Sequence, residues 1–241
     1  MSSPKRLARF AGLLYLLNAI ASGFAFAYVL GKVFVSGNAA ATAANVVANP
    51  GLVRAGAVAD LFNGTEWVIL AMALYLLLRH VHKNAATAMV VLVSVGAAIV
   101  CLNEVFQFAA VRVATDSSYA TAVGAAGSNA LVLLLLDVHH YGFLIAQIFF
   151  GLWLVPFGYL AYKSAMFPKA LGVALIVGGA CYLVGLLAVF LVPDSGEKIN
   201  VFVTIPSAIA ETSMMLYLLV KGVKTPKPDE RIAASPVVAA A

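Results

Sequence analysis

Six apolar segments of about twenty residues or more dominate this chain, and each is long enough to cross a bilayer as a helix. They run over residues 10–30, 55–78, 85–110, 134–161, 171–192 and 201–220. A soluble fold would not cover so much apolar surface, because 63% of the 241 residues are hydrophobic and 10% are charged. Soluble domains carry about 25% charged residues. The segments therefore predict an all-α polytopic membrane protein, a six-transmembrane-helix bundle whose main partner is the lipid bilayer.

The distribution of Lys and Arg predicts how this bundle is oriented. Most of the fifteen basic residues fall on one side of the predicted spans, namely Lys5, Arg6, Arg9, Arg79, Lys83, Lys163, Lys169, Lys221, Lys224, Lys227 and Arg231. The loops on the other side hold Lys32, Arg54, Arg112 and Lys198. Because cytoplasmic loops carry the excess of Lys and Arg, both termini are predicted to be cytoplasmic. The basic residues form no stripe, so the net charge of +5 does not indicate a nucleic-acid partner.

The remaining segments connect or flank the spans of a single domain, residues 1–223. Residues 36–50 begin with capping residues and end in Asn-Pro, which predicts a short interfacial helix at the outer surface. The small and polar residues of 115–129 predict an outer loop or a second short helix. The first apolar segment is longer than the core of a signal peptide, which predicts an uncleaved span. The tail, residues 224–241, is predicted to be disordered.

The acidic residues follow a different pattern from the basic ones. Five of the ten lie within or at the edge of a span, whereas no Lys or Arg lies at a span centre. A carboxylate in the hydrocarbon region is costly unless it faces a polar cavity or a partner. Counting residues from the span ends puts most polar side chains in the outer half of the bundle. We therefore predict an outward-facing acidic cavity lined by Asp60, Asn63, Glu66, Asn103, Glu104, Asp137, His140 and Glu211.

The fourth span contains the histidines that fall inside the predicted bundle. Asp137 and His140 are three residues apart and share one helix face, so the carboxylate can orient the imidazole. His139 points to roughly the opposite side. Mixed nitrogen and oxygen ligands suit zinc or another divalent transition metal. The candidate metal ligands are therefore His140, Asp137 and Glu211.

Three kinds of function remain open for this cavity. The first is binding of a proton, a metal ion or a small polar ligand. In the second, a metal ion with an open position activates water, and the chain is an intramembrane metal-dependent hydrolase. In the third, the polar residues hydrogen-bond to one another between helices, and the protein is structural. The sequence has no HExxH motif and no repeated His spacing, so it identifies no catalytic residues and favours a non-enzymatic role.

Several motifs in fixed order resemble one known family. They are VADLF at 58–62, LDVHHYG at 136–142, IFFGLW at 148–153, FPKALGVALIVGG at 167–179 and LLVKGV at 218–223. Together they resemble the bacterial membrane family called domain of unknown function 4386, over residues 7–223. The resemblance implies a multi-pass protein of the bacterial inner (plasma) membrane and transfers no activity. It places Asp60, Asp137, His140 and Glu211 inside matching motifs. A small residue is expected in place of His139, which favours His140 as the ligand.

Overall fold

The computed structural model describes residues 3–192 and 194–224, and it is a bundle of long antiparallel helices. Six helices or joined helices are long and apolar enough to cross a membrane, which confirms the predicted all-α six-span architecture. In chain order the elements are α1 (Pro4–Ser22), η1 (Gly23–Leu30), α2 (Gly31–Val33), α3 (Ala39–Ala48), α4 (Pro50–Leu78), α5 (Lys83–Thr115), α6 (Ser117–Lys163), α7 (Lys169–Leu191), α8 (Gly196–Val203) and α9 (Ile205–Val220).

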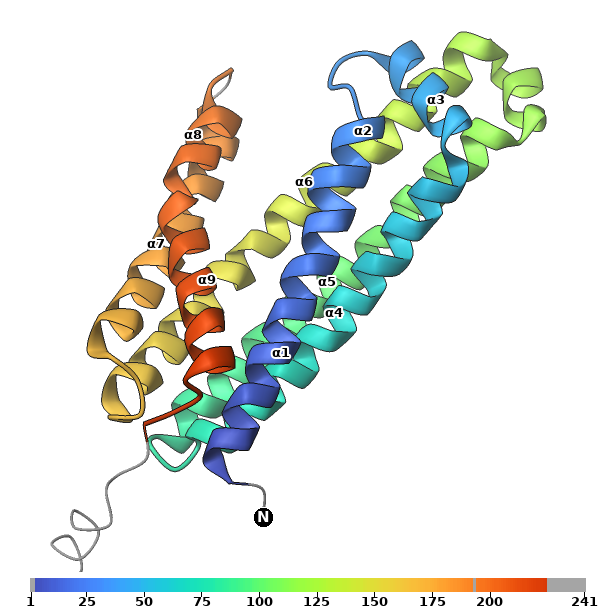
Figure 1. Cartoon of the computed structure of the whole chain (residues 1–241). Helices are drawn as coiled ribbons and strands as arrows, with labels where there is room; N and C mark the ends of the chain where they lie inside the picture. The colour runs from blue at the N-terminus through green and yellow to red at the C-terminus, as the bar shows by residue number, and fades with distance from the viewer. Residues whose placement is uncertain (1–2, 193, 225–241) are drawn as a thin grey trace, which may run out of the picture.

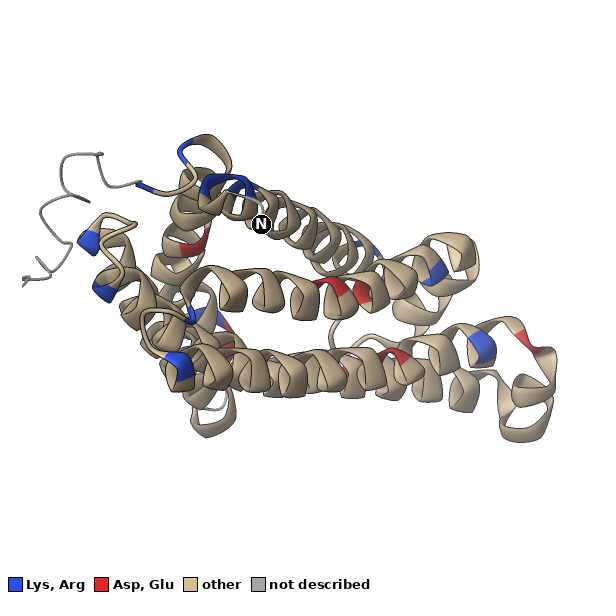
Figure 2. Cartoon of the chain, turned by 90° about the horizontal axis from the view of Figure 1, so that it is seen from below, with Lys and Arg blue, Asp and Glu red and all other residues tan. Residues whose placement is uncertain are grey.

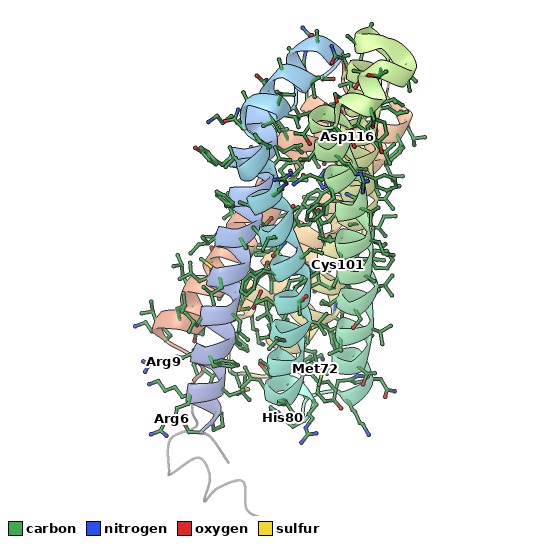
Figure 3. All side chains as sticks on the ribbon, turned by 90° about the vertical axis from the view of Figure 1, so that its right-hand side faces the viewer. Arg6, Arg9, Met72, His80, Cys101 and Asp116 are labelled. Carbon is green, nitrogen blue, oxygen red and sulfur yellow. The ribbon has the colours of Figure 1, made fainter. Side chains whose placement is uncertain are left out.

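The two ends of the bundle differ in charge. We call the end that holds the N-terminus and the end of α9 proximal, and the end that holds α3 and the start of α6 distal (Figure 1). Figure 2 shows most of the drawn Lys and Arg residues near the proximal end, and a few near the distal end. Figure 3 labels Arg6, Arg9 and His80 at the proximal end and Asp116 at the distal end. Basic residues thus gather at the proximal end of the bundle.

Local capping explains where several helices begin. The Nδ1 atom of His82 accepts a hydrogen bond from the Ala85 amide at 3.1 Å and caps α5. The Asp116 carboxylate accepts from the Ser118 amide at 3.0 Å and caps α6. The segment 115–129, predicted as a loop or a short helix, is helical on both sides of Gly124. This glycine has φ 78° and breaks α6 near its start, in a region that favours glycine.

Glycines let the backbones of α6 and α7 touch. A Cβ atom added at Gly158 would lie 2.5 Å from the carbonyl oxygen of Gly172. A Cβ atom added at Gly179 would lie 2.6 Å from the carbonyl oxygen of Gly151. Small residues at such crossings are typical of helices that pack inside membranes. The contacts fix how α6 is rotated about its own axis, and so decide which way its polar side chains point.

The helices lie closer together near the proximal end than near the distal end. Figure 1 shows α8 and α9 diverging from α1 toward the distal end, where side chains of α6 contact α8. The main apolar core includes the buried side chains of Leu74, Trp153, Phe157 and Met214. The predicted interfacial helix corresponds to α3, at the distal end. The predicted disordered tail falls outside the described residues, apart from Lys224.

Candidate functional site

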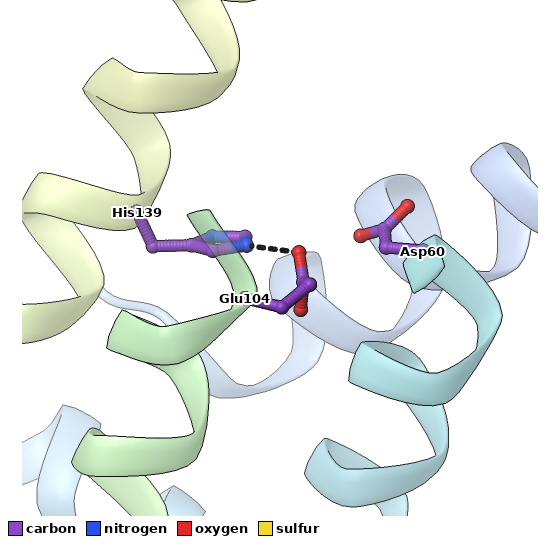
Figure 4. A group of neighbouring side chains, drawn as sticks. All are labelled: Asp60, Glu104 and His139. Atoms are coloured by element: carbon purple, nitrogen blue, oxygen red, sulfur yellow. Dashed lines mark hydrogen bonds and ion pairs between the residues drawn. The ribbon is translucent and has the colours of Figure 1, made fainter. Parts of the chain in front are cut away.

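Three polar side chains from three different helices meet inside the distal half of the bundle. Asp60 comes from α4, Glu104 from α5 and His139 from α6, and Figure 4 shows them directed toward one another. Each residue offers one ligand atom, and the three atoms lie within 4.8 Å of one another. The Nε2 atom of His139 is 2.9 Å from the Oε1 atom of Glu104. We call these residues the Asp60 cluster.

The Asp60 cluster is buried, and part of its hydrogen-bonding capacity is not used. The relative exposures of Asp60, Glu104 and His139 are 3%, 2% and 2%. Within the part of the chain that the structure describes, Asp60 Oδ1, Glu104 Oε2 and His139 Nδ1 have no hydrogen-bond partner. Buried polar atoms without a partner are uncommon in folded proteins, and each one calls for an explanation. The cluster can therefore bind a proton or a metal ion.

Amide side chains brace the helices around the cluster. Asn103 on α5 donates from Nδ2 to the carbonyl oxygen of His139 on α6 at 2.6 Å. The Asn103 side chain occupies the space that a Cβ atom at position 142 would need, so Gly142 permits this contact. Gln107 on α5 donates from Nε2 to the carbonyl oxygen of Val53 on α4 at 2.9 Å. These bonds hold α4, α5 and α6 in register at the level of the cluster.

A cavity of about 380 Å³ lies on the proximal side of the cluster. Its lining includes Asn63 on α4, Val100 on α5 and Phe143 on α6. Each of these residues lies three or four positions from the cluster residue on the same helix, which is about one helical turn. None of the three cluster residues lines the cavity. The cluster and the cavity are therefore adjacent but separate features.

A further carboxylate inside the bundle, the half-buried Glu211 on α9, belongs to the cavity wall. The hydroxyl of Tyr15 on α1 donates to its Oε2 atom at 2.5 Å. The hydroxyl of Tyr182 on α7 donates to its Oε1 atom at 2.9 Å. Both carboxylate oxygens are thus hydrogen-bonded, and three spans meet at one acidic group.

Amide groups form the rest of the polar lining. Gln147 on α6 donates from Nε2 to Asn200 Oδ1 at 2.9 Å and to the carbonyl oxygen of Tyr182 at 2.8 Å. Asn18 on α1 donates from Nδ2 to the carbonyl oxygen of Asn63 at 3.4 Å. The Oδ1 atom of Asn63 accepts no hydrogen bond from any described residue. The amide nitrogens of Gln147 and Asn18 therefore donate within the protein, and Asn63 contributes a buried acceptor without a partner among the described residues.

The structure divides the polar residues that the sequence assigns to one cavity. Asp60 and Glu104 enter the cluster and Asn103 braces it, whereas Asn63 and Glu211 line the cavity. Glu66 is buried, and neither of its carboxylate oxygens has a partner among the described residues. Asp137 is half-buried on α6 and lines none of the three cavities found.

The expected metal ligands His140, Asp137 and Glu211 do not come together. In the described ranges, the group of ligand atoms close enough for a metal ion contains His139, and none of those three. The Nε2 atom of His140 instead lies 3.2 Å from Glu197 Oε1, on α8. The correction concerns the rotation of α6: neighbouring residues of a helix point about 100° apart, and His139 is the histidine that faces α5, whereas His140 faces α8.

Sequence reasoning missed His139, Tyr15 and Tyr182. A signal for His139 was available, because Asp60 and Glu104 lie at the same predicted depth and a histidine near that depth is a natural partner. The tyrosines look like aromatic packing residues in a sequence. However, the hydroxyl of a tyrosine inside a bundle needs a hydrogen-bond partner. Glu211, near the centre of its predicted span, is a candidate acceptor.

Comparison with known proteins yields one family. The family model described as Domain of unknown function (DUF4386) matches residues 10–222. Neither the search of curated proteins nor the search of solved structures returns a match.

Proposed function

The chain belongs to the family described as Domain of unknown function (DUF4386), and from that premise we propose that it is a membrane protein that binds a divalent metal ion in the Asp60 cluster. One observation carries the proposal. Side chains from three helices bring a histidine nitrogen and two carboxylate oxygens within 4.8 Å of one another, in a buried setting where three polar atoms of these residues have no hydrogen-bond partner in the described part of the chain. Mixed nitrogen and oxygen ligation suits zinc and other first-row transition metals.

The charge of the cluster matches that of one divalent ion. Two carboxylates and a neutral imidazole carry a charge of about −2, and a buried group of that charge is costly without compensation. The ion pairs among the described residues are His139 with Glu104 and His140 with Glu197, so no Lys or Arg compensates the cluster. One divalent cation would neutralise the cluster, whereas protons would have to bind twice, once on His139 and once on a carboxylate.

The distances support the same ion. Metal–ligand bonds of about 2.0–2.2 Å put two ligand atoms of one metal ion at most about 4.4 Å apart. The cluster atoms already lie within 4.8 Å of one another, so small side-chain rotations would complete a site. The contact between His139 Nε2 and Glu104 Oε1 would then be replaced by two bonds to the metal ion.

The metal site supports binding better than catalysis. A hydrolase needs an open coordination position beside a space that admits substrate. The cluster residues are buried, and the cavity lies one helical turn away with none of them in its lining. A purely structural set of hydrogen bonds would leave each carboxylate with an amide or hydroxyl partner, and Glu104 Oε2 has none among the described residues.

We further propose that the proximal end faces the cytoplasm of a bacterial cell and that the bundle lies in its inner membrane. The concentration of Lys and Arg at the proximal end supports this orientation. In that orientation, the Asp60 cluster lies in the outer half of the membrane.

The experiment compares the metal content of matched carboxylate variants. The full chain is purified in dodecyl maltoside with an affinity tag that contains no histidine, incubated with Zn²⁺ or Mn²⁺, desalted and measured by mass spectrometry. We expect about one metal ion per chain in the wild type and a loss of most of it in Asp60→Asn and His139→Gln. Glu66→Gln is the control, because it neutralises an equally buried carboxylate outside the cluster.

The proposal is overturned if the wild type binds neither metal, or if Asp60→Asn and His139→Gln keep their metal. Gel filtration and circular dichroism establish that each variant is folded. Loading with Co²⁺ adds a direct reading, because the visible absorption of a bound Co²⁺ ion reports the ligands around it. That absorption is expected in wild type and Glu66→Gln, and not in His139→Gln.

A further inference from the structure

The cavity beside Glu211 has a single sign of charge. Glu211 is the carboxylate in its lining, and that lining holds no Lys, Arg or His residue. A low-dielectric cavity with one acidic group attracts cations and repels anions. Its volume of about 380 Å³ lies within the range of small-molecule sites, roughly 300–1,000 Å³. The cavity therefore has room for more than an inorganic ion.

Aromatic rings line this cavity in an unbroken series. From its distal side, Phe26 stacks on Phe143 with ring centroids 4.6 Å apart. Phe143 then meets Phe150 at 5.3 Å, and Phe150 meets Trp67 at 5.3 Å. Trp67 contacts Trp153 at 5.7 Å. All five of these residues belong to the lining of the cavity.

The series ends at the acidic group. The Trp153 ring lies 5.8 Å from the ring of Tyr15, whose hydroxyl donates to Glu211. At the other end, Phe26 stacks on His140 with centroids 6.3 Å apart, next to the contact between His140 and Glu197 on α8. A series of aromatic rings thus leads from the distal part of the bundle to the Glu211 carboxylate.

From these contacts we propose that the cavity binds an amphipathic organic amine in its protonated form. The ammonium group lies beside Glu211, and the apolar part of the ligand lies along the aromatic rings. Aromatic faces attract ammonium groups through their quadrupoles, most strongly for tryptophan. A carboxylate at the end of such a series adds a full opposite charge.

The hydrogen bonds around Glu211 also favour an amine. The hydroxyls of Tyr15 and Tyr182 already donate to Glu211, and the amide nitrogen of Gln147 already donates twice. Each oxygen of a carboxylate can accept more than one hydrogen bond. Glu211 can therefore accept further bonds from the N–H groups of a protonated amine.

The cavity also contains its own optical reporter. The chain has two tryptophans, Trp67 and Trp153, and both line the cavity. A ligand that enters it changes the surroundings of every tryptophan in the protein. Intrinsic fluorescence of the full chain in dodecyl maltoside, a detergent without an ammonium group, thus measures binding without a label.

The test uses three probes that share a phenyl group and a four-carbon chain but differ in charge. They are 4-phenylbutylamine, 4-phenylbutanol and 4-phenylbutyrate, titrated at neutral pH into the wild-type protein. We expect the amine to bind about tenfold or more tightly than the alcohol, and the butyrate to bind most weakly. Equal affinities of the amine and the alcohol, or no response to the amine, would overturn the proposal without any variant.

Two variants locate the charge. Glu211→Gln keeps the size of the side chain and is expected to remove the preference for the amine while leaving the affinity for the alcohol nearly unchanged. Asp137→Asn is the control, because it removes a carboxylate from α6 that does not line the cavity. Retention of the full amine preference in a folded Glu211→Gln protein would contradict the assigned position. The Asp60 cluster is not part of this site, so loss of metal binding and loss of amine binding are separable results.

Discussion

The Asp60 cluster and the Glu211 site solve the same problem in different ways. Both hold carboxylates inside a membrane bundle, where such groups are costly. Glu211 accepts a phenolic hydrogen bond on each oxygen and borders an open volume. The cluster shares its charge between two carboxylates and an imidazole, keeps polar atoms without partners among the described residues and does not line that volume. We therefore expect the hydrogen-bonded Glu211 beside its cavity to bind a molecule, and the crowded carboxylates of the Asp60 cluster to bind an ion.

The largest effect is expected where the cluster loses one member. Glu104→Leu leaves the buried His139 Nε2 without its partner, so the free energy of unfolding should fall by about 3–5 kcal/mol. The measurement is thermal or denaturant unfolding in detergent without added metal. The double variant Glu104→Leu/His139→Leu should recover most of this loss, because it removes both polar partners together. If the single variant is as stable as wild type, the two residues do not depend on each other.

An intermediate effect is expected at the Glu211 site. Tyr182→Phe removes one of two hydroxyls that donate to the half-buried Glu211 carboxylate, which should cost about 1.5–3 kcal/mol of unfolding free energy. Tyr159→Phe is the matched control, because the Tyr159 ring is partly exposed and its hydroxyl has no hydrogen bond among the described residues. Equal unfolding midpoints for the two variants would show that Glu211 is held by something other than its tyrosines.

The smallest effect is expected at a carboxylate in water. Hydrogen bonds from the side chain and backbone of Ser118 lower the pKa of Asp116 at the start of α6. A lowered pKa in the folded state means that this cap stabilises the helix above the unfolded pKa of about 3.9. The stabilisation is lost as the pH falls through the folded value.

Hydrogen exchange of the first turn of α6 measures this loss. Above about pH 5, wild type should exchange more slowly there than Asp116→Ala, and the difference should vanish in acid below the folded pKa. A difference that persists in acid would mean that Asp116 caps the helix in its neutral form. The result shows how much a carboxylate in water stabilises its helix, for comparison with the Asp60 cluster and the Glu211 site.

The sequence predicted the spans well because bilayer thickness fixes their length. The stretches around α4, α5 and α7 are apolar over a full span, and their ends are marked by Arg, Lys or Pro. The continuation of α6 through 115–129 was harder to predict, since small polar residues suit both loops and helix ends. A single glycine at position 124 breaks that helix without ending it.

The site was predicted in its composition and not in its arrangement. Asp60 and Glu104 were among the expected polar residues, but helical spacing alone does not say which face of α6 meets α5. That rotation depends on contacts between distant residues, such as Gly158 against Gly172 and Asn103 beside Gly142. Steric fit between glycines and their neighbours carries almost no signal in a single sequence, and it decides between His139 and His140.

The length of α6 has a consequence for how the protein meets its surroundings. From residue 125 to Lys163 the helix has 39 residues, or about 58 Å, whereas the hydrocarbon layer is about 30 Å thick. Even when tilted, such a helix extends well past the lipid. Residues 121–126 are exposed at its far end, beyond α3. Antibodies, proteases and neighbouring proteins on that side of the membrane would contact residues 121–126 first.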